Sequence, residues 1–216
     1  MKRKLSILLA VLFCVTMLSA GKNNNVGYDK AEQAGLAFLH TAFGIDATEG
    51  KVKRCASFNE VTIDGEKIAH ESSTLVNFYH VAVFDPETNY PYYTAEVNAV
   101  TGVAYRAEYA RRYIQLSAEQ QNKAASLGAL DSFADFDFSA YKQEAVDAAY
   151  RYIQDHFASE DHVLRVIPDE VETNSDIFPM VDVDSFVLMK SGTAYRVKVC
   201  WPSLTVTEVY ILGENP

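Results

Sequence analysis

The chain has 216 residues and a formal net charge of -10 at pH 7, from 29 acidic and 19 basic side chains. Phosphate-rich partners such as nucleic acids, and anionic membrane surfaces, require a basic patch. Since no segment of the sequence is strongly basic, the composition argues against both kinds of partner. It favours a soluble protein outside the cell, long enough for one or two domains.

The first residues have the form of a secretory signal peptide. A basic start, Lys2-Arg3-Lys4, precedes an apolar run from Leu5 to Leu18 and the small residues Ser19-Ala20-Gly21. That order is typical of a cleaved leader. The run is shorter than the roughly 20 residues that span a bilayer, which disfavours the alternative of a retained anchor. We therefore predict that residues 1–21 form a signal peptide. The mature protein would be secreted or associated with the cell envelope, without stable membrane insertion.

A first helix-then-strands unit is predicted over residues 27–110. Asp29 and Glu32 have the spacing of a capping box, and a periodic apolar face then leads to Phe43, with Gly44 as the stop. Extended segments rich in β-branched and aromatic residues follow, separated by turn residues. The predicted strands are residues 52–54, 76–84, 92–100 and 103–109.

Residues 111–138 are predicted to be a helical linker. Ser117 and Gln120 again have capping-box spacing, and the short helix that they begin would end at Gly128. Its composition, mainly Ala, Gln, Lys and Leu, is that of a spacer.

A second unit, residues 139–213, repeats the order of the first. A helix beginning near Ser139 matches the first helix after a shift of 114 positions, so that Ala31 falls on Ala145 and Phe43 on Phe157. Strands are expected at residues 163–165, 181–190, 194–201 and 204–212. The predicted fold class is therefore α+β, with two tandem modules that each carry one helix on an antiparallel sheet. Whether the modules pack together is left open.

The sequence resembles the PepSY family, whose modules occur in peptidase propeptides and in cell-envelope and spore-germination proteins. The motif that carries the likeness is Tyr92-Tyr93-Thr94-Ala95-Glu96-Val97-Asn98-Ala99-Val100-Thr101-Gly102-Val103, similar to the family's closing hairpin, and the likeness covers about Tyr28 to Tyr109. In the second unit, Trp201-Pro202-Ser203-Leu204 replaces the Thr-Gly turn. The resemblance implies a helix-on-sheet fold related to cystatins and a role in binding or restraining peptidases. It designates no catalytic residue.

Cys55 and Cys200 remain after removal of the leader, one in each unit. Strand alternation places both side chains off the core face. In an oxidising compartment they are candidates for a disulfide that joins the two units, and two unpaired thiols are the alternative.

No motif of the chain indicates an enzyme. There is no His-Glu-x-x-His spacing and no Gly-x-Ser-x-Gly elbow, so neither a metal cofactor nor a serine nucleophile is predicted. A site assembled in space from residues such as Ser73 and His80 is the alternative. The carboxylate pairs at Asp135 and Asp137 and at Asp182 and Asp184 suggest weak calcium binding or, more simply, a solvated edge. No cofactor is expected.

Tyr90, Tyr92 and Tyr93 follow the turn at Asn89 and are the candidate binding residues. An exposed sheet edge can accept an extended peptide, and aromatic residues are common at such contacts. Packing between helix and sheet is the alternative role for these tyrosines.

Together these patterns predict an exported, non-enzymatic module that binds an extracytoplasmic protein or peptide, for which the resemblance suggests a peptidase. A structural protein of the envelope or spore coat is one alternative. A binder of small molecules or glycans in the cleft between the modules is another.

Overall fold

A computed structural model describes residues 25–57, 60–63, 66–69, 76–128, 139–158, 161–173 and 180–213. The predicted signal peptide, Ser73 and the carboxylates of Asp135 and Asp137 lie outside the described residues. The first half of the chain contains α2 (Tyr28–Phe43), β1 (Lys51–Ser57), β2 (Glu60–Ile63), β3 (Glu66–Ala69), β4 (Val76–Phe84), β5 (Pro91–Asn98) and β6 (Ala104–Tyr109). A short 3-10 helix (Arg111–Tyr113) and α3 (Ala118–Gly128) lead to α4 (Ser139–His156), β7 (Val163–Thr173), β8 (Val181–Met189), β9 (Ala194–Trp201) and β10 (Thr205–Ile211).

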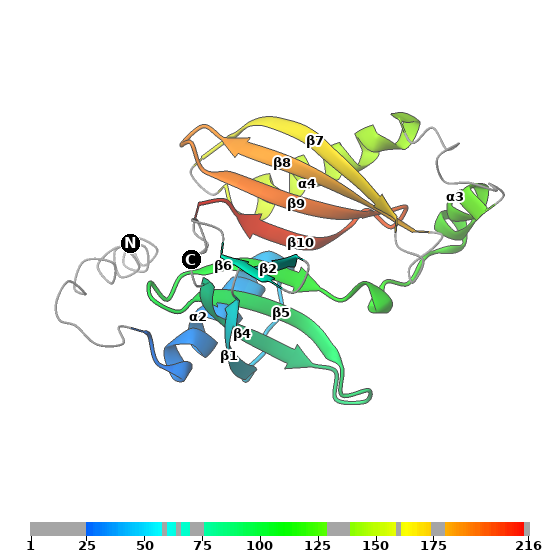
Figure 1. Ribbon diagram of the computed structural model, residues 1–216. Coiled ribbons are helices and arrows are strands. Elements are labelled where there is room, and N and C mark those ends of the chain that lie inside the picture. Colours follow the sequence, from blue (N-terminus) through cyan, green and yellow to red (C-terminus); the bar gives the residue numbers. More distant parts are fainter. Residues whose placement is uncertain are drawn as a thin grey trace, which may run out of the picture.

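Eight of these strands form one antiparallel sheet in the order β1-β4-β5-β6-β10-β9-β8-β7, and β2 and β3 form a separate hairpin. The protein is therefore α+β, as predicted. Within each half the strands are neighbours in chain order, and the last strands of the two halves, β6 and β10, meet at the centre (Figure 1). The two halves are thus joined in a single sheet.

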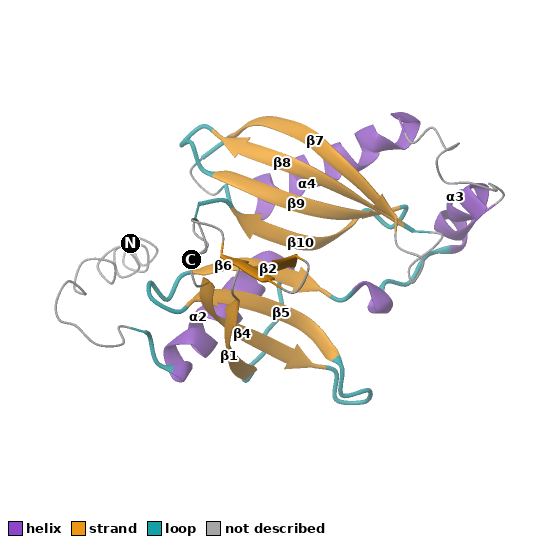
Figure 2. Ribbon diagram, viewed as in Figure 1, coloured by secondary structure: helices purple, strands orange, loops and turns teal. Residues whose placement is uncertain are grey.

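Both long helices lie on the same face of this sheet (Figure 2). Helix α2 packs against β4, β5 and β6, and α4 packs against β7, β8 and β9. The helices also touch each other near their carboxyl ends, where the rings of Phe38 and Phe157 are 5.8 Å apart and Tyr152 Oη donates to the Ala42 carbonyl at 2.8 Å. One hydrophobic core, including the fully buried Leu39, Ile153 and Trp201, therefore runs beneath both helices.

Several predicted boundaries are confirmed. Residues 76–84 and 194–201 are strands as expected, and the capping box at Ser117 is present, with the Ser117 and Gln120 side chains and backbone amides bonded reciprocally at 2.8 and 3.2 Å. The capping box at Asp29 is wrong. The N-cap is Gly27, without a side-chain bond, and Glu32 instead accepts a hydrogen bond from the Gly50 amide at 2.8 Å.

The last turns of the two halves have the same backbone hydrogen bond despite their different sequences. Gly102 N donates to Asn98 O and Leu204 N donates to Cys200 O, both at 2.8 Å. The two donors both have left-handed backbones, with φ of 74° at Gly102 and 59° at Leu204. In the first turn, the Asn98 side chain also accepts bonds from two following amides. In the second, Ser203 Oγ donates to the Cys200 carbonyl. Different side chains thus support the same backbone hydrogen bond, although only the second turn contains a cis peptide bond, between Trp201 and Pro202.

Gly35 sets the distance between α2 and the sheet, and its replacement tests that contact. A Cβ atom at Gly35 would lie 2.7 Å from Cγ2 of Val81, a buried residue of β4. We expect Gly35→Ala to lower the free energy of unfolding by about 1–3 kcal/mol, because overpacking outweighs the gain in helix propensity. Urea unfolding followed by circular dichroism measures the change. The matched control is Gly27→Ala, where a Cβ meets no atom within 4 Å. Equal, small effects of the two substitutions would contradict the contact.

Candidate functional site

The face of the eight-stranded sheet opposite α2 and α4, here called the helix-free face, carries two clusters of interacting charged side chains. Because directly opposed residues of neighbouring strands share a face, the register defines one row of side chains across the whole sheet. From β1 to β7 the row is Lys53, His80, Glu96, Arg106, Tyr210, Arg196, Phe186 and Ile167. It crosses the junction between the two halves without interruption.

Arg106 of β6 is the centre of the first ionic cluster. Its guanidinium lies 2.9 Å from Glu96 of β5, 3.0 Å from Glu208 of β10 and 3.6 Å from Glu108. Tyr105 Oη donates to the second carboxylate oxygen of Glu96 at 2.8 Å. Burial alone would lower the pKa of Arg106, but the carboxylates, Glu208 first, hold it above its usual value. This arginine thereby connects the two halves of the sheet.

A second cluster lies on β7, β8 and β9. Asp182 and Asp184 of β8 are buried, with side chains 1% exposed, and each has a close cation: Arg111 is 2.6 Å from Asp182, and Arg196 is 3.0 Å from Asp184. Lys198 lies 3.6 Å from Asp184 and 2.7 Å from Glu172. The prediction of a solvated acidic edge at Asp182 and Asp184 is therefore wrong, because β8 is an inner strand and these carboxylates are paired with cations.

Burial and ion pairing shift the pKa values of the carboxyl groups in this second cluster in opposite directions. Burial raises the pKa of Asp182 to about 6, against the opposing effects of Arg111 and Lys198, and it also raises the pKa of Asp184. Bonding to Lys198 lowers the pKa of Glu172. One buried oxygen of each aspartate, Oδ1, has no hydrogen-bond partner. Among the described residues, no group of three or more His, Cys, Asp or Glu side chains is arranged to hold a metal ion.

A shallow hollow of about 620 Å³ opens on this face beside the junction of β6 and β10. Its lining combines charged and aromatic side chains with one leucine, and includes Arg106, Glu170, Phe186, Arg196, Tyr210 and Leu212. Its volume lies in the range of sites for small ligands, about 300–1,000 Å³. Charges of both signs and aromatic rings therefore meet where the two halves join.

The tyrosines singled out from the sequence do not form a binding edge. Strand β5 pairs with β4 on one side and β6 on the other, so its backbone is not free to accept a peptide. Tyr93 stacks on Tyr109 at 5.1 Å, and Tyr92 lies edge-on to Tyr113 at 4.3 Å. Tyr90 is 55% exposed in the preceding turn, beneath the guanidinium of Arg112. Tyr92 and Tyr93 thus have the alternative role, aromatic packing.

The two cysteines are unpaired. Cys55 lies in β1 and Cys200 in β9, with four strands between them, so that about 24 Å of sheet separates the thiols. A disulfide requires Cα atoms within about 7 Å. As predicted, the Cys200 side chain lies on the face of its strand that points away from the helices. It is nevertheless buried, with its Sγ 3.7 Å from Met180 Sδ. The fold therefore excludes the candidate disulfide between them and agrees with the alternative of two unpaired thiols.

No protein-family model matches the chain, and neither the curated proteins nor the solved structures yield a significant match. The PepSY likeness accordingly rests on the hairpin motif around Thr101-Gly102 and stays a prediction. In the part of the chain that the structure describes, none of the helices combines the length and the apolar character of a membrane span.

The raised pKa of Asp182 predicts a specific pH dependence of stability. A folded-state pKa near 6, above the ordinary value of 3.8, means that the folded chain holds an extra proton between about pH 4 and pH 6. This aspartate therefore makes the protein less stable as the pH rises through that window. We expect the free energy of unfolding of Asp182→Asn, minus that of the natural chain, to increase from about pH 4 to pH 6 and then to level off. Urea titrations across this range measure it. A difference that decreases would show that the Arg111 ion pair outweighs burial.

The thiols are expected to differ in reactivity. Burial and the neighbouring Asp182 raise the pKa of the Cys200 thiol to about 12, whereas Cys55 is partly exposed on the outermost strand. Because the thiolate is the reactive form, a maleimide should label Cys55 rapidly and Cys200 only after unfolding. Mass spectrometry of the mature chain counts the labels, and Cys55→Ser is the control that should stay unlabelled while folded. Fast labelling at both positions, or at neither, would contradict this arrangement.

Proposed function

We propose that the mature chain is an exported, non-enzymatic binding protein of two tandem helix-on-sheet modules, and that its helix-free face contacts a protein or peptide partner outside the membrane. The observation that carries the proposal is the row of side chains across all eight strands, on a face that neither α2 nor α4 covers. A large, ordered sheet surface of this kind suits recognition of another protein.

The charges of this face support recognition rather than chemistry. Arg106, Arg196 and Lys198 are each held by carboxylates within 4.0 Å, so their positions are fixed before a partner arrives. Complementary charges on a partner give specificity and faster association more than raw affinity. Preorganised side chains also lose little conformational freedom on binding.

The two-module interpretation is supported by the mirrored strand order. It is also supported by the last turns, in which Gly102 and Leu204 both have left-handed backbones and donate the equivalent hydrogen bond. Under this interpretation both modules are PepSY-like and cystatin-like, and a peptidase is the candidate partner. Binding would restrain or modulate that peptidase without a catalytic residue from this chain.

The hollow beside the β6–β10 junction favours a second candidate, a small molecule or glycan. Phe186 and Tyr210 would provide aromatic surfaces, and Arg196 and Glu170 polar groups. This combination is common in small-ligand sites. The hollow is shallow, however, and a side chain of a protein partner would fit the same place.

The test is capture of partners from the native secretome and envelope with the mature chain, residues 22–216, as bait, followed by a peptidase assay of what is retained. The variant Glu170→Lys/Leu212→Glu changes two exposed residues of the helix-free face, and Tyr150→Glu is the matched control on the outer surface of α4. We expect the natural chain and the control to retain the same partner. The double variant should bind it at least about tenfold more weakly, which corresponds to a loss of about 1.4 kcal/mol of binding free energy over the two altered contacts.

A retained peptidase whose activity changes in proportion to the bait would establish regulation of that peptidase. Recovery of envelope proteins alone would identify a structural protein instead. Capture that is unaffected by the double variant but lost in the control would place the contact on the helices and overturn the proposed face.

A further inference from the structure

The sheet has two outermost strands, β1 and β7, and they differ in how suitable they are for strand addition. Within the described residues, β1 pairs only with β4, and β7 only with β8. An unpaired edge presents backbone N–H and C=O groups to which an extended segment can bond. Each edge is therefore a candidate site for a partner's strand.

Strand β7 has features that protect edges from pairing. It contains Pro168, which cannot donate a hydrogen bond, and its register with β8 shifts twice, once on each side of Val166. Asp169 and Glu170 project from it into solvent. Proline, irregular register and charge are the devices by which native proteins blunt an edge. Pairing along β7 is thus disfavoured.

Strand β1 is regular by comparison. All seven of its residues, Lys51 to Ser57, pair with β4 in uninterrupted register, and it contains no proline. Its backbone therefore offers a regular template of bonding groups at one end of the sheet.

The side chains of β1 are basic although the chain as a whole is acidic. Lys51, Lys53 and Arg54 are all exposed, in a protein with net charge -10. Lys51 lies 4.0 Å from the ring centre of Phe84, and Arg54 donates to Asn77 Oδ1 at 3.0 Å. Within the described part of the chain, none of the three cations has a carboxylate within 4.0 Å, unlike the cations of the two ionic clusters. Their charge remains available to a partner.

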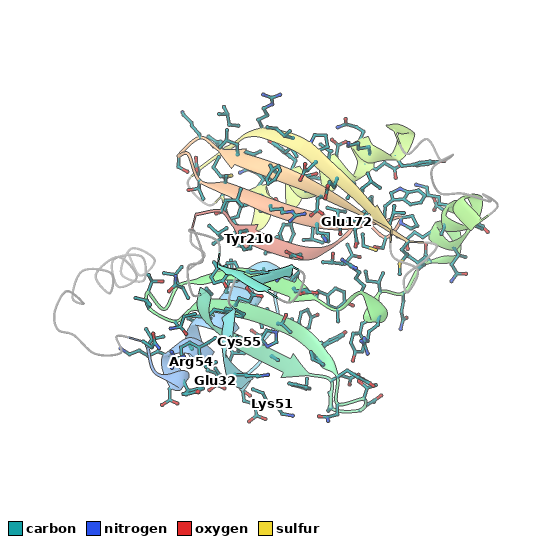
Figure 3. All side chains as sticks on the ribbon, in the orientation of Figure 1. Glu32, Lys51, Arg54, Cys55, Glu172 and Tyr210 are labelled. Atoms are coloured by element: carbon teal, nitrogen blue, oxygen red, sulfur yellow. The ribbon has the colours of Figure 1, made fainter. Side chains whose placement is uncertain are left out.

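A second hollow, of about 520 Å³, lies at the start of β1 and has the opposite charge. Glu32, Asp46 and Glu49 line it, together with Lys51 and Phe84. Glu32 of α2 and Lys51 of β1 both line this hollow, and Figure 3 labels both side chains. A strand lying along β1 would meet positive charge at its middle and negative charge at the end over the hollow.

We propose that the outer edge of β1 takes up an extended segment of a polypeptide partner, acidic opposite Lys53 and Arg54 and with a basic side chain at the end that lies over the Glu32 hollow. The inference rests on the proposed binding function and supplies its partner chemistry. Backbone bonds to β1 provide the affinity, and the charge pattern selects the segment.

Two other occupants are disfavoured by the same charges. A second copy of the chain paired β1 to β1 would bring like-charged side chains together across the strands, which is destabilising. A uniform polyanion such as a nucleic acid would meet repulsion from the three carboxylates of the hollow. Only a segment with charges of both signs, in the order described, matches the whole edge.

Because Lys53 and Arg54 are consecutive strand residues and point to opposite faces of the sheet, the segment must carry acidic side chains on both of its faces. The probe is therefore a synthetic threonine-rich peptide with two consecutive glutamates and one terminal lysine, compared with a peptide in which each charge is reversed. A fluorophore on Cys55, the partly exposed thiol of β1, reports binding to the full mature chain. We expect the first peptide to bind and the charge-reversed one not to bind, with affinity that falls as salt rises. In Lys53→Glu/Arg54→Glu the preference should invert, with about a tenfold loss for the first peptide. An inverted preference cannot result from misfolding.

The matched control is Arg165→Glu, an exposed charge reversal on β7 that should leave both affinities unchanged. Binding of neither peptide, or equal binding of both, would overturn the β1 proposal. Two further results would overturn it. One is the formation of dimers, seen by analytical ultracentrifugation, that Lys53→Glu/Arg54→Glu abolishes. The other is preferential binding of a single-stranded oligonucleotide.

If partner capture from the secretome persists in Lys53→Glu/Arg54→Glu, the edge proposal fails and the proposed function stands. If the natural chain captures nothing, the proposed function itself fails.

Discussion

The pairing of β6 with β10 is the contact on which the rest of the structure depends. Three residue pairs join these strands, yet they make eight strands into one sheet and one core beneath two helices. Arg106 reinforces the junction from the helix-free face by binding Glu96 of one half and Glu208 of the other. On the opposite face, α2 and α4 meet through Phe38 and Phe157. The junction is therefore fastened on both faces of the sheet.

Local patterns were enough to predict most of the elements. Alternation and turn residues located strands such as Val76–Phe84, and Gly44 marked the end of α2. The β2–β3 hairpin was missed, although Asp64-Gly65 between its strands is a strong hairpin signal. The prediction of Asp29 as the N-cap is wrong because capping-box spacing alone does not determine at which residue a helix begins. Here the N-cap of α2 is Gly27.

The site was less predictable because it depends on which strands become neighbours. Nothing local to Asp182 or Asp184 indicates that β8 will be an inner strand, or that Arg111 will reach Asp182 from another part of the chain. The same lack of information made β5 appear to be an edge. Alternation could place Lys53, Glu96 and Arg106 off the core face, but only the register between strands brings them into one row. The overall negative charge also gave no indication that Lys51, Lys53 and Arg54 would be exposed together on β1.

The mirrored strand order has a consequence for how such a protein could arise. If either half stood alone, β6 or β10 would be an open edge, and two such halves would associate at a rate set by their concentration. Joining them in one polypeptide makes that meeting intramolecular, with an effective concentration that short tethers bring to the millimolar range. Only three residue pairs are then sufficient to close the sheet, and the strand left free at each end is the first one of its half. The sequences of β1 and β7 can consequently change without disturbing the centre of the sheet. In this protein β1 has kept a regular edge that can pair with another strand, whereas β7 has acquired features that prevent such pairing.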